Sequence, residues 1–492
     1  MLDRRGFLKA AALLPLSTPG SVLAARSAEP AASTELVNDI HSQLNPTHVA
    51  RIVKPTSLED VQAIIRQAAR DKRALSVAGG RHSMGGQQFG ADTVLVDTRS
   101  MKKILAFDKE SGILEVEAGI QWPELIAGYL EKQEGDARPW GIAQKQTGAD
   151  RLCIGGALAS NVHGRGLKLK PFDSDVESFR LVDATGQVRT CSRAENPKLF
   201  SLAAGGYGLF GVVYSVKLRL TPRRKLERKV EVIDRDELAA AFAKRIEAGY
   251  LYGDFQFSID PAGEDFMKRG VFSCYRPADD RPSVPERQLS DSDWIGLLEL
   301  THTNPAEAFQ RYAAYYLSTD GQVYWSDTQQ LGFYPDDYHR ALDAKLGTPT
   351  STEIIGELYV PRPQIGPFLQ EMGAALRAQS VRVIYGTVRL IEKDDDSFLP
   401  WARERYACVV VNLHTTHTPE GIERSAAAFR RLIDLASKRG GSFFLTYHRF
   451  ATKAQVAACY PRFAEFLAAK EALDPQARFQ SDWWRHYRKL FA

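Results

Sequence analysis

The chain has few cysteines, and they follow none of the spacings that bind metal. The five are Cys153, Cys191, Cys274, Cys408 and Cys459, and no two of them form a Cys-x-x-Cys pair. An odd number of scattered cysteines argues against a disulfide framework and favours buried, unpaired thiols. The sequence therefore predicts neither a zinc site nor a fold held by disulfides.

Strong charge and long apolar runs are also absent. The net charge is +4 over 492 residues, and the basic residues are spread out, so nothing indicates a nucleic-acid partner. The chain has no apolar run of roughly 18 residues or more, which argues against a transmembrane helix in the mature protein. No internal repeats or low-complexity tracts occur after residue 34. The length favours two or more globular domains.

The N-terminus carries an export signature. Residues 3–9 read Asp-Arg-Arg-Gly-Phe-Leu-Lys, and a short apolar stretch and a small-residue region ending near Ala25 follow them. This order predicts a twin-arginine (Tat) signal peptide over residues 1–25, removed after export by the Tat machinery to the periplasm or the medium. That route carries folded proteins, which suits a protein that loads a cofactor in the cytoplasm.

Residues 78–86, Ala-Gly-Gly-Arg-His-Ser-Met-Gly-Gly, are the most informative segment. The preceding run, Leu75–Ala78, has strand character. A strand that enters a glycine-rich turn exposes several backbone N–H groups together and can hold a pyrophosphate. No Lys-Ser or Lys-Thr pair follows, so this is not a nucleotide-triphosphate loop. His82 lies inside the turn; the alternative interpretation is a surface turn with an incidental histidine.

The flanking sequence predicts strand, helix, strand, turn and strand in that order. The helix begins with a capping-box pattern, Ser57-Leu-Glu-Asp60. Apolar residues then recur on one helical face. They are Val61, Ile64, Ile65, Ala68 and Ala69, and the strands are expected at residues 49–54, 75–78 and 93–97.

Two further glycine-rich segments follow, at residues 153–166 and 204–212. The second of these contains Gly206-x-Gly208-x-x-Gly211, the spacing of a dinucleotide-binding fingerprint. That fingerprint needs a strand before the glycines and a helix after them. Here residues 196–203 look helical and residues 213–220 alternate like a strand, so the order is inverted and a Rossmann fold is disfavoured.

These three segments, in this order, resemble the PCMH-type FAD-binding domain of the vanillyl-alcohol oxidase superfamily. The motifs are most similar to those of alditol oxidases, decaprenylphosphoryl-ribose oxidase and cytokinin dehydrogenases. The resemblance implies an α+β fold in which residues 45–222 form a two-subdomain FAD-binding domain. Residues 223–440 would form a substrate cap with an antiparallel sheet, and residues 441–492 would return to the FAD domain.

The resemblance also implies the cofactor and its contacts. FAD would be bonded covalently through its 8-methyl group to His82. Cys153 lies near the second attachment point of doubly linked members but is displaced by about two residues, so we expect one bond only. The implied cofactor-binding residues are Ala78, Gly79, Gly80, Arg81, His82, Ser83, Gly86, Cys153, Gly155, Gly156, Ser160, His163, Gly164, Gly206, Gly208, Gly211 and Val212.

The second half of the chain mixes strand-like and helical patterns. Strands are expected at residues 356–360, 381–391 and 407–413, and helices at residues 236–248 and 424–437. That mixture suits an antiparallel sheet covered by helices. We interpret the basic run Arg223–Lys229 as a solvated connector, residues 277–293 as a loop or flap, and Trp483 and Trp484 as packing residues.

A flavin oxidoreductase that removes a hydride needs a proton acceptor and a cation near the reacting carbon. By resemblance, Arg389 is the cation, and Thr387 stands where alditol oxidases have Glu. Tyr447 and His448 stand where the relatives have a substrate-site Lys, and either could relay a proton.

Other residues could contribute to the cap. His414 could face the flavin. Strand alternation separates it from His417, which disfavours a metal site shared by these two. Glu357 and Tyr359 are expected to line the cap.

The sequence thus predicts an exported FAD-dependent enzyme that oxidises the CH–OH group of a sugar, polyol or hydroxylactone. Dioxygen or a periplasmic redox carrier would reoxidise it. Three alternatives remain open: C–N oxidation of an amine, as in cytokinin dehydrogenases; a flavin-binding protein without turnover; and a sugar-binding module without flavin.

Overall fold

The computed structural model describes residues 34–282, 287–332, 335 and 337–492. Residues 34–492 form one contact unit. The predicted signal peptide over residues 1–25 lies outside the described residues and stays a prediction.

The first sheet is parallel and has the strand order β3-β5-β4. Its strands are β3 (Arg51–Val53), β4 (Leu75–Ala78) and β5 (Val94–Asp97), with helix α1 (Leu58–Arg70) between the first two. The Ser57 hydroxyl accepts a hydrogen bond from the Asp60 N–H (3.1 Å). The Asp60 carboxylate bonds to Thr56 instead of Ser57, so only half of the predicted capping box forms. The predicted apolar face is buried at Val61, Ile65 and Ala68, whereas Ala69 is exposed.

A second sheet, of five antiparallel strands, has the order β10-β9-β11-β7-β6. It comprises β6 (Ile104–Asp108), β7 (Ile113–Glu117), β9 (Val176–Val182), β10 (Val188–Ser192) and β11 (Val212–Arg219). Helices α2 (Trp122–Lys132), α3 (Ile154–Ser160) and α4 (Pro197–Ala203) connect these strands. The third glycine-rich segment lies after α4 and before β11, as predicted, and this inverted order excludes a Rossmann fingerprint there.

An eight-stranded sheet has the order β16-β13-β15-β14-β18-β19-β17-β20, and each strand is antiparallel to its neighbours. The strands are β13 (Lys225–Asp234), β14 (Tyr252–Phe257), β15 (Arg269–Pro277), β16 (Val323–Trp325), β17 (Ser351–Pro361), β18 (Val383–Ile391), β19 (Tyr406–Thr416) and β20 (Ser442–Phe443). This sheet, with the mixture of helices and strands, confirms the predicted α+β class.

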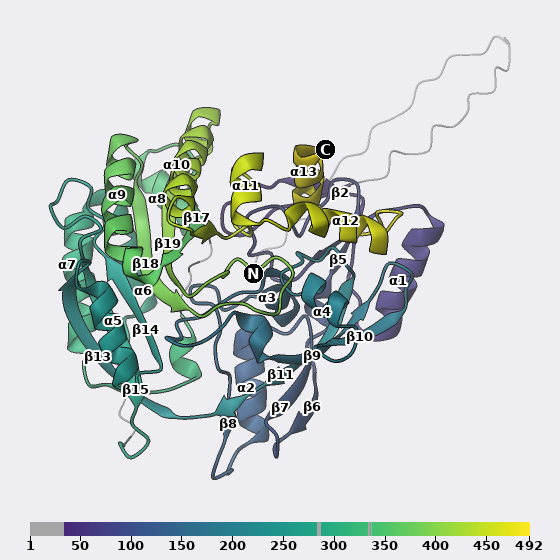
Figure 1. Ribbon diagram of the computed structural model, residues 1–492, viewed down its shortest axis with the longest axis horizontal. Helices are drawn as coiled ribbons and strands as arrows, with labels where there is room; N and C mark the ends of the chain where they lie inside the picture. The colour runs from purple at the N-terminus through teal and green to yellow at the C-terminus, as the bar shows by residue number, and fades with distance from the viewer. Residues whose placement is uncertain (1–33, 283–286, 333–334, 336) are drawn as a thin grey trace, which may run out of the picture. The chain divides into compact units, whose positions relative to one another are not determined.

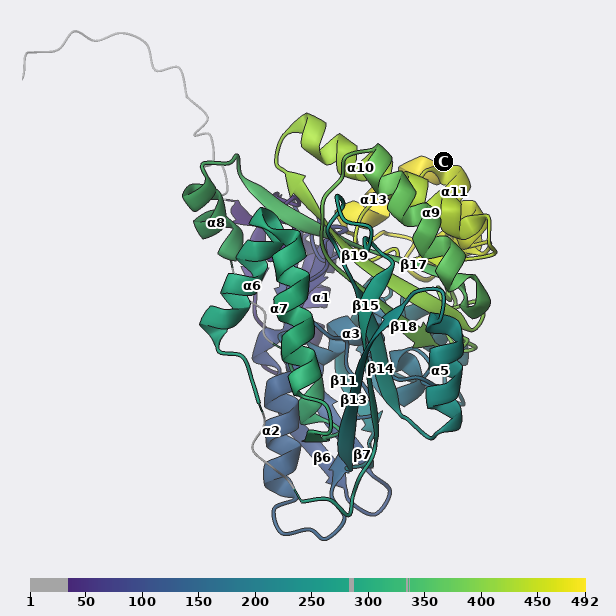
Figure 2. The ribbon, with the colours of Figure 1, turned by 90° about the vertical axis from the view of Figure 1, so that its left-hand side faces the viewer.

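Helices cover both faces of the large sheet (Figure 2). One face carries α5 (Leu238–Glu247), α9 (Ile365–Ala378) and α10 (Pro419–Ser437). The other carries α6 (Asp291–Thr303), α7 (Pro305–Ser318) and α8 (Tyr338–Leu346). Gly356 faces α10, because a Cβ built on it would lie 2.1 Å from the ring of Phe429. Its neighbour Glu357 therefore points to the opposite face.

The basic run Arg223–Lys229 is not a solvated connector, so that prediction is wrong. Most of it belongs to β13, and Arg228 is only 8% exposed. Its guanidinium packs over the rings of Tyr275 and Tyr324 and donates to the Tyr275 hydroxyl. Arginine can be buried in this way because its planar group stacks on aromatic rings while its N–H groups find acceptors.

The C-terminal residues lie against the first sheet (Figure 1). Leu75 of β4 donates to the Arg478 carbonyl (2.7 Å) and accepts from Gln480 (2.8 Å). Trp483 is fully buried, with its ring 4.6 Å from that of Tyr207. The helices here are α11 (Lys453–Cys459), α12 (Phe463–Leu473) and α13 (Asp482–Phe491). The domain boundaries themselves stay predictions.

Short elements complete the described chain. They are β1 (Glu35–Val37), β2 (Thr47–Val49), β8 (Trp140–Gly141), β12 (Thr221–Pro222) and the 3-10 helices η1 (Thr98–Ser100), η2 (Phe172–Asp175), η3 (Thr328–Gln330) and η4 (Arg362–Gln364). Within the predicted loop 277–293, Pro277 ends β15, residues 278–282 and 287–290 are irregular, and residues 291–293 begin α6; residues 283–286 lie outside the described residues.

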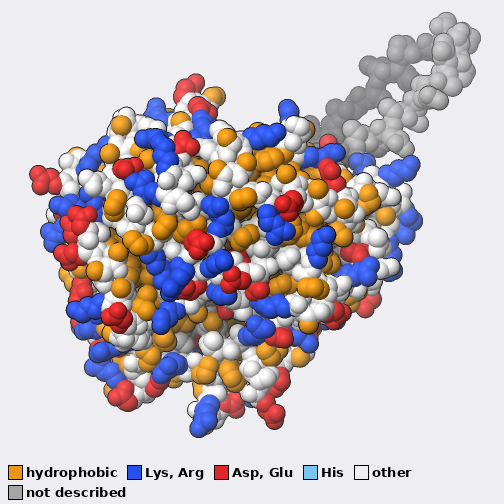
Figure 3. All heavy atoms as spheres, viewed as in Figure 1, with side chains coloured by type: hydrophobic (Ala, Val, Ile, Leu, Met, Phe, Trp, Pro, Cys, Tyr) orange, Lys and Arg blue, Asp and Glu red, His pale blue; other side chains and the backbone are white. Residues whose placement is uncertain are grey.

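Charges of both signs are mixed on the face shown in Figure 3, where basic side chains are scattered among acidic and apolar ones. None of the helices in the described ranges has the length and apolar character that crossing a bilayer requires.

Candidate active site

The three glycine-rich segments meet at one cleft. The lining residues among those predicted to bind the cofactor are Gly79, Gly80, Arg81, His82, Ser83, Cys153, Gly155, Gly156, Ser160, Gly208 and Gly211. Segments more than 100 residues apart in the sequence thus come together. Small residues at these positions leave room for a large ligand and let its phosphates approach the backbone.

Two glycines show why side chains are excluded from this cleft. A Cβ on Gly80 would lie 2.2 Å from the carbonyl oxygen of Arg151, so the first two segments can approach only because Gly80 has none. A Cβ on Gly156 would meet no atom within 4 Å. Since Gly156 lines the cleft, a side chain there would occupy the ligand's space without disturbing the protein.

Buried polar atoms without partners also indicate a missing ligand. Among the cleft residues, Arg81 Nε, His82 Nε2, Gln87 Oε1 and Gln88 Oε1 have no hydrogen-bond partner. An unsatisfied buried polar atom is costly unless a ligand or water completes it. A glycine-lined cleft whose donors and acceptors lack partners in the protein fits a flavin with its pyrophosphate.

His82 is buried in this cleft, and its ring contacts that of His41. Its Nδ1 is 2.9 Å from Nε2 of His41. Burial, and then the neighbouring His41, keep the pKa of His82 well below its usual value, so the ring is neutral at pH 7. Cys153 also lines the cleft, but burial raises the pKa of its thiol to about 12. The neutral thiol fits the expectation of a single attachment point.

Some predicted cofactor residues do not line the cleft. Gly206 packs against α4, where a Cβ would lie 2.0 Å from the Leu202 carbonyl oxygen, and Val212 lies in an apolar core. Gly164 packs against Lys145. The remaining ones are Ala78 at the end of β4, Gly86, which lies near Asn45 and Arg449, and His163.

Other lining residues were not predicted. They are Val77, Gln87, Gln88, Thr98, Ala118, Leu152, Ala159, Tyr207 and Val213. Tyr207 lies between two predicted glycines, and Gln87 and Gln88 directly follow the first segment, so adjacency could have indicated them. Thr98 and Ala118 follow β5 and β7, and only the sheet topology brings them to the cleft.

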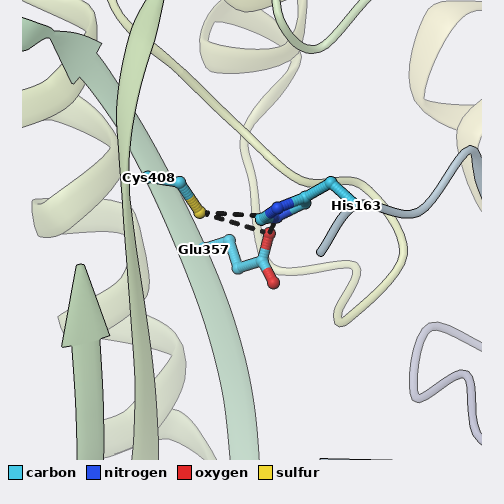
Figure 4. Close-up of side chains that lie close together, drawn as sticks. All are labelled: His163, Glu357 and Cys408. Atoms are coloured by element: carbon cyan, nitrogen blue, oxygen red, sulfur yellow. Dashed lines mark hydrogen bonds and ion pairs between the residues drawn. The ribbon is translucent and has the colours of Figure 1, made fainter. Parts of the chain in front are cut away.

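A buried polar network lies on the face of the large eight-stranded sheet that points away from α10. Its centre is Glu357 of β17, with His163 from the loop after α3 and Cys408 from β19 (Figure 4). Oε2 of Glu357 is 3.0 Å from His163 Nε2 and accepts from the Tyr359 hydroxyl at 2.7 Å. Oε1 accepts from the Tyr447 hydroxyl at 2.8 Å. Both carboxylate oxygens are thus held by donors.

These neighbours keep Glu357 ionised. Burial alone raises the pKa of the carboxyl group, but His163, then Arg389 and Tyr359, lower it to about 2. Both ring nitrogens of His163 face oxygen acceptors, Glu357 on one side and the Gly164 carbonyl on the other. Burial and Glu357 raise the pKa of Tyr447 well above its usual value, so it stays a donor.

Arg389 lies beside this network. On β18 it is directly opposite Cys408, which is itself opposite Tyr359. The guanidinium is buried and its Nε has no hydrogen-bond partner. Thr387 is two residues away on the same face, and its hydroxyl is also buried without a partner. These two groups can bind the hydroxyl or ring oxygens of a substrate.

The network is directly connected to the cleft. Thr446 accepts from the Gln87 amide through its carbonyl (2.8 Å), and its hydroxyl is 3.3 Å from that of Ser160. Gln87 and Ser160 both line the cleft. Tyr447, which bonds to Glu357, directly follows Thr446 in the chain. These two consecutive residues therefore connect the cleft to Glu357.

The structure does not bring two of the predicted catalytic residues into this network. His448 stacks on Phe429 of α10 (4.4 Å) and on Phe450 (5.0 Å), and burial lowers its pKa to about 3. His414 pairs across the sheet with Glu353, four residues before Glu357, and its ring is next to His302 of α6. Tyr447 and His448 lie in the irregular segment after β20, where Tyr447 bonds to Glu357 and the ring of His448 lies against Phe429.

Comparison with known proteins agrees with this geometry. The profile of an FAD-binding domain family matches residues 49–192, and that of D-arabinono-1,4-lactone oxidase matches residues 354–487. The chain is 24% identical to L-gulono-1,4-lactone dehydrogenase of Mycobacterium tuberculosis over 88% of this chain and 95% of that protein. It is 28% identical to mitochondrial L-galactono-1,4-lactone dehydrogenase of Arabidopsis thaliana over 44% of this chain and 36% of that protein.

A solved structure shares the fold. A solvent-stable cholesterol oxidase superposes with a TM-score of 0.67 and 15% identity, covering 92% of this chain and 98% of that one. The chain thus combines an FAD-binding domain with a D-arabinono-1,4-lactone oxidase domain, in agreement with the resemblance to the vanillyl-alcohol oxidase superfamily of flavoproteins. It is an FAD-dependent oxidoreductase that acts on CH–OH donors, which decides against the C–N alternative.

Proposed function

We propose that this enzyme oxidises a CH–OH group of a sugar-derived 1,4-lactone. The buried Glu357 network carries the proposal, because it sets an ionised carboxylate and Arg389 beside the cofactor cleft. The lactone is supported by the family profile over residues 354–487 and by the names of the relatives. The experiment is anaerobic mixing with 1,4-lactones, alditols and amines. Reduction of the flavin by lactones alone supports the proposal, and reduction by alditols or amines alone contradicts it.

The residues of the site divide the work. FAD, when bound in the cleft, supplies the hydride acceptor. Glu357 accepts the hydrogen bond of the substrate hydroxyl and then its proton. A carboxylate of low pKa suffices, because an O–H becomes strongly acidic as its carbon turns into a carbonyl. Tyr447 and Tyr359 hold the carboxylate in place, and Arg389 stabilises negative charge on the substrate oxygen.

The unpartnered groups on the sheet face argue against a flavin-binding protein without turnover. Thr387 Oγ1 and Arg389 Nε are buried without a hydrogen-bond partner. Such atoms are expected where a polyhydroxylated substrate completes the hydrogen bonds. Thr387 stands where alditol oxidases have Glu, and in this chain Glu357 supplies the carboxylate instead.

We further propose that FAD is bonded covalently through His82. The neutral ring, its unpartnered Nε2 and its contact with His41 support this. The bond replaces a C–H of the flavin methyl group and an N–H of His82, so two electrons and two protons pass to an acceptor such as dioxygen. After acid precipitation, yellow colour should stay in the pellet and be absent from the pellet of His82→Ala. Release of the colour from the wild-type pellet would refute the linkage.

Export through the Tat pathway is a separate proposal, supported by Arg4 and Arg5 in the N-terminal signature. Changing both residues to Lys should leave the flavin-containing protein in the cytoplasm, whereas the wild type should appear in the periplasm or medium. Equal distribution of the two proteins in cell fractions would contradict it.

A further inference from the structure

A second group of imidazoles and a carboxylate lies on the same sheet face as Glu357. His302 is on α6, His339 on α8 and Glu353 on β17. One donor atom from each lies within 4.8 Å of the other two. The Nε2 atom of His339 is 2.7 Å from Glu353 Oε2, and Nε2 of His302 is 3.4 Å from Glu353 Oε1. Three separate elements, of which α8 directly precedes β17 in the chain, thus direct ligand-type atoms to one point.

The surroundings leave a donor atom unused. Nε2 of His302 has Glu353 as its neighbour at 3.4 Å, and Nδ1 of His414, which lies opposite Glu353 on β19, is buried without a hydrogen-bond partner. The rings of His302 and His414 have their centres 5.2 Å apart. The hydroxyl of Tyr338 donates to Oε1 of Glu353 and orients the carboxylate. Buried nitrogens without partners are rare and need a ligand or water.

We propose that His302, His339 and Glu353 bind a divalent transition metal, for which Zn²⁺ has the matching donor preference. Imidazole nitrogens and a carboxylate oxygen bind zinc at about 2.0–2.2 Å, in tetrahedral sites with one further position. The two nitrogens lie 3.4 and 2.7 Å from the carboxylate oxygens of Glu353, which are separations between neighbouring ligand atoms and leave the metal position between them. The bond from Tyr338 is the outer-shell contact that orients a ligating carboxylate in such sites.

The metal would fix α6 to the sheet. Of the residues of α6, only His302 is buried, although the helix carries several apolar side chains, and Ile295 is 45% exposed. Apolar packing therefore anchors this helix weakly. A bond from His302 through a metal to β17 and α8 would supply the missing attachment, since metal binding stabilises the folded arrangement of its ligands.

The other group with metal-like spacing, His163, Glu357 and Cys408, does not fit a metal. Both oxygens of Glu357 already accept hydrogen bonds from tyrosines. Burial raises the pKa of the Cys408 thiol well above its usual value, so zinc binding there would have to release a proton from a neutral thiol. This group serves as the internal comparison.

The test uses the full chain with its flavin, without a polyhistidine tag, stripped with a chelator and titrated with Zn²⁺. Zinc per chain is measured by mass spectrometry after desalting, and the zinc-induced change in Tm by thermal unfolding. We expect one zinc per chain and a higher Tm in the wild type. His339→Gln and Glu353→Gln should bind zinc at least about tenfold more weakly. Cys408→Ser and His48→Gln, an exposed histidine of β2, should bind as the wild type does.

The flavin absorbance of each variant reports whether it folds. Should the ligand variants fail to fold, Co²⁺ binding by the wild type still decides. Visible d–d bands without a thiolate charge-transfer band are expected, and a thiolate band would place the metal at Cys408. Substoichiometric zinc in the wild type, retention of zinc by both ligand variants, or its loss in Cys408→Ser would each overturn the proposal.

Discussion

The cofactor cleft and the polar face of the large sheet are assembled in different ways. The cleft is built largely from three glycine-rich segments, each of which can be recognised in the sequence by itself. Backbone groups, and the space left where glycines have no side chain, form most of the binding surface. The sheet face is built from single side chains on β17, β18 and β19, with His163 and Tyr447 added from distant loops. Strand register aligns the residues of the three strands, and tertiary packing brings His163 and Tyr447 to them.

This difference separates binding from chemistry. Backbone in the cleft can hold FAD whatever the substrate, whereas the side chains on the sheet face decide which substrate reacts. Substitutions in the two regions should therefore have different signatures: loss of flavin in one, and loss of turnover with full flavin in the other.

The largest expected effect is on the sheet face. Glu357→Gln should lower the rate of flavin reduction by about 10²- to 10⁴-fold, because it removes the proton acceptor while keeping the shape. The flavin content should stay at the wild-type level. Anaerobic stopped-flow spectroscopy measures the rate, and the absorbance ratio measures the content. If the variant loses flavin but its remaining flavin is reduced at the normal rate, Glu357 serves flavin binding and the proposed separation of the two regions is wrong.

The reverse signature is expected in the cleft. Gly156→Ala places a methyl group in the ligand's space without touching protein atoms. FAD binding should weaken by about tenfold or more, while the apoprotein keeps its Tm or gains slightly from better helix propensity. Gly296→Ala on α6, which also meets no atom within 4 Å, is the matched control. Equal flavin content in both variants would be contrary to the account.

A smaller effect is expected at Thr387. Thr387→Val removes a hydroxyl that has no protein partner, so KM for the substrate should rise roughly three- to tenfold with kcat little changed. Thr415→Val is the control, since its hydroxyl bonds to Ser425 within the protein. That control should lower stability and leave KM unaltered. An unchanged KM in Thr387→Val would remove this residue from the substrate site.

The smallest effect is expected at His448. Its neutral ring stacks between phenylalanines, so His448→Phe should keep kcat within about twofold. Tyr447→Phe, one residue earlier, removes the hydrogen bond to Glu357 and should have the larger effect. Steady-state kinetics on both variants measures kcat. A larger loss of kcat in His448→Phe than in Tyr447→Phe would show that His448 takes part in the reaction.

The sequence predicts the cleft better than the sheet face, for a physical reason. Strand β4 begins and ends at the predicted residues, and His82 lies in the cleft, because turn chemistry is local. Glu357 could be expected to line the cap. Its pairing with His163, almost 200 residues away, depends on tertiary packing.

The wrong prediction, of a solvated connector, has the same origin, and so does a contact that was not predicted. The charges of Arg223–Lys229 suggested solvent, yet alternate residues of β13 point inward, and Arg228 is satisfied by tyrosines from other elements. The relation of His414 to His302 and Glu353 likewise requires α6 to fold over the sheet. No local pattern contains that contact.

The pH dependence of flavin reduction in the wild type tests the role of Glu357 most directly. Catalysis requires the ionised carboxylate, and its pKa of about 2 keeps it ionised as pH falls. The apparent second-order rate constant for reduction, which reports groups of the free enzyme, should show no loss between about pH 8 and pH 5. It should decline only as the pH falls further toward that pKa. A loss centred between about pH 6 and pH 7 would show that another group, such as a histidine, takes the proton.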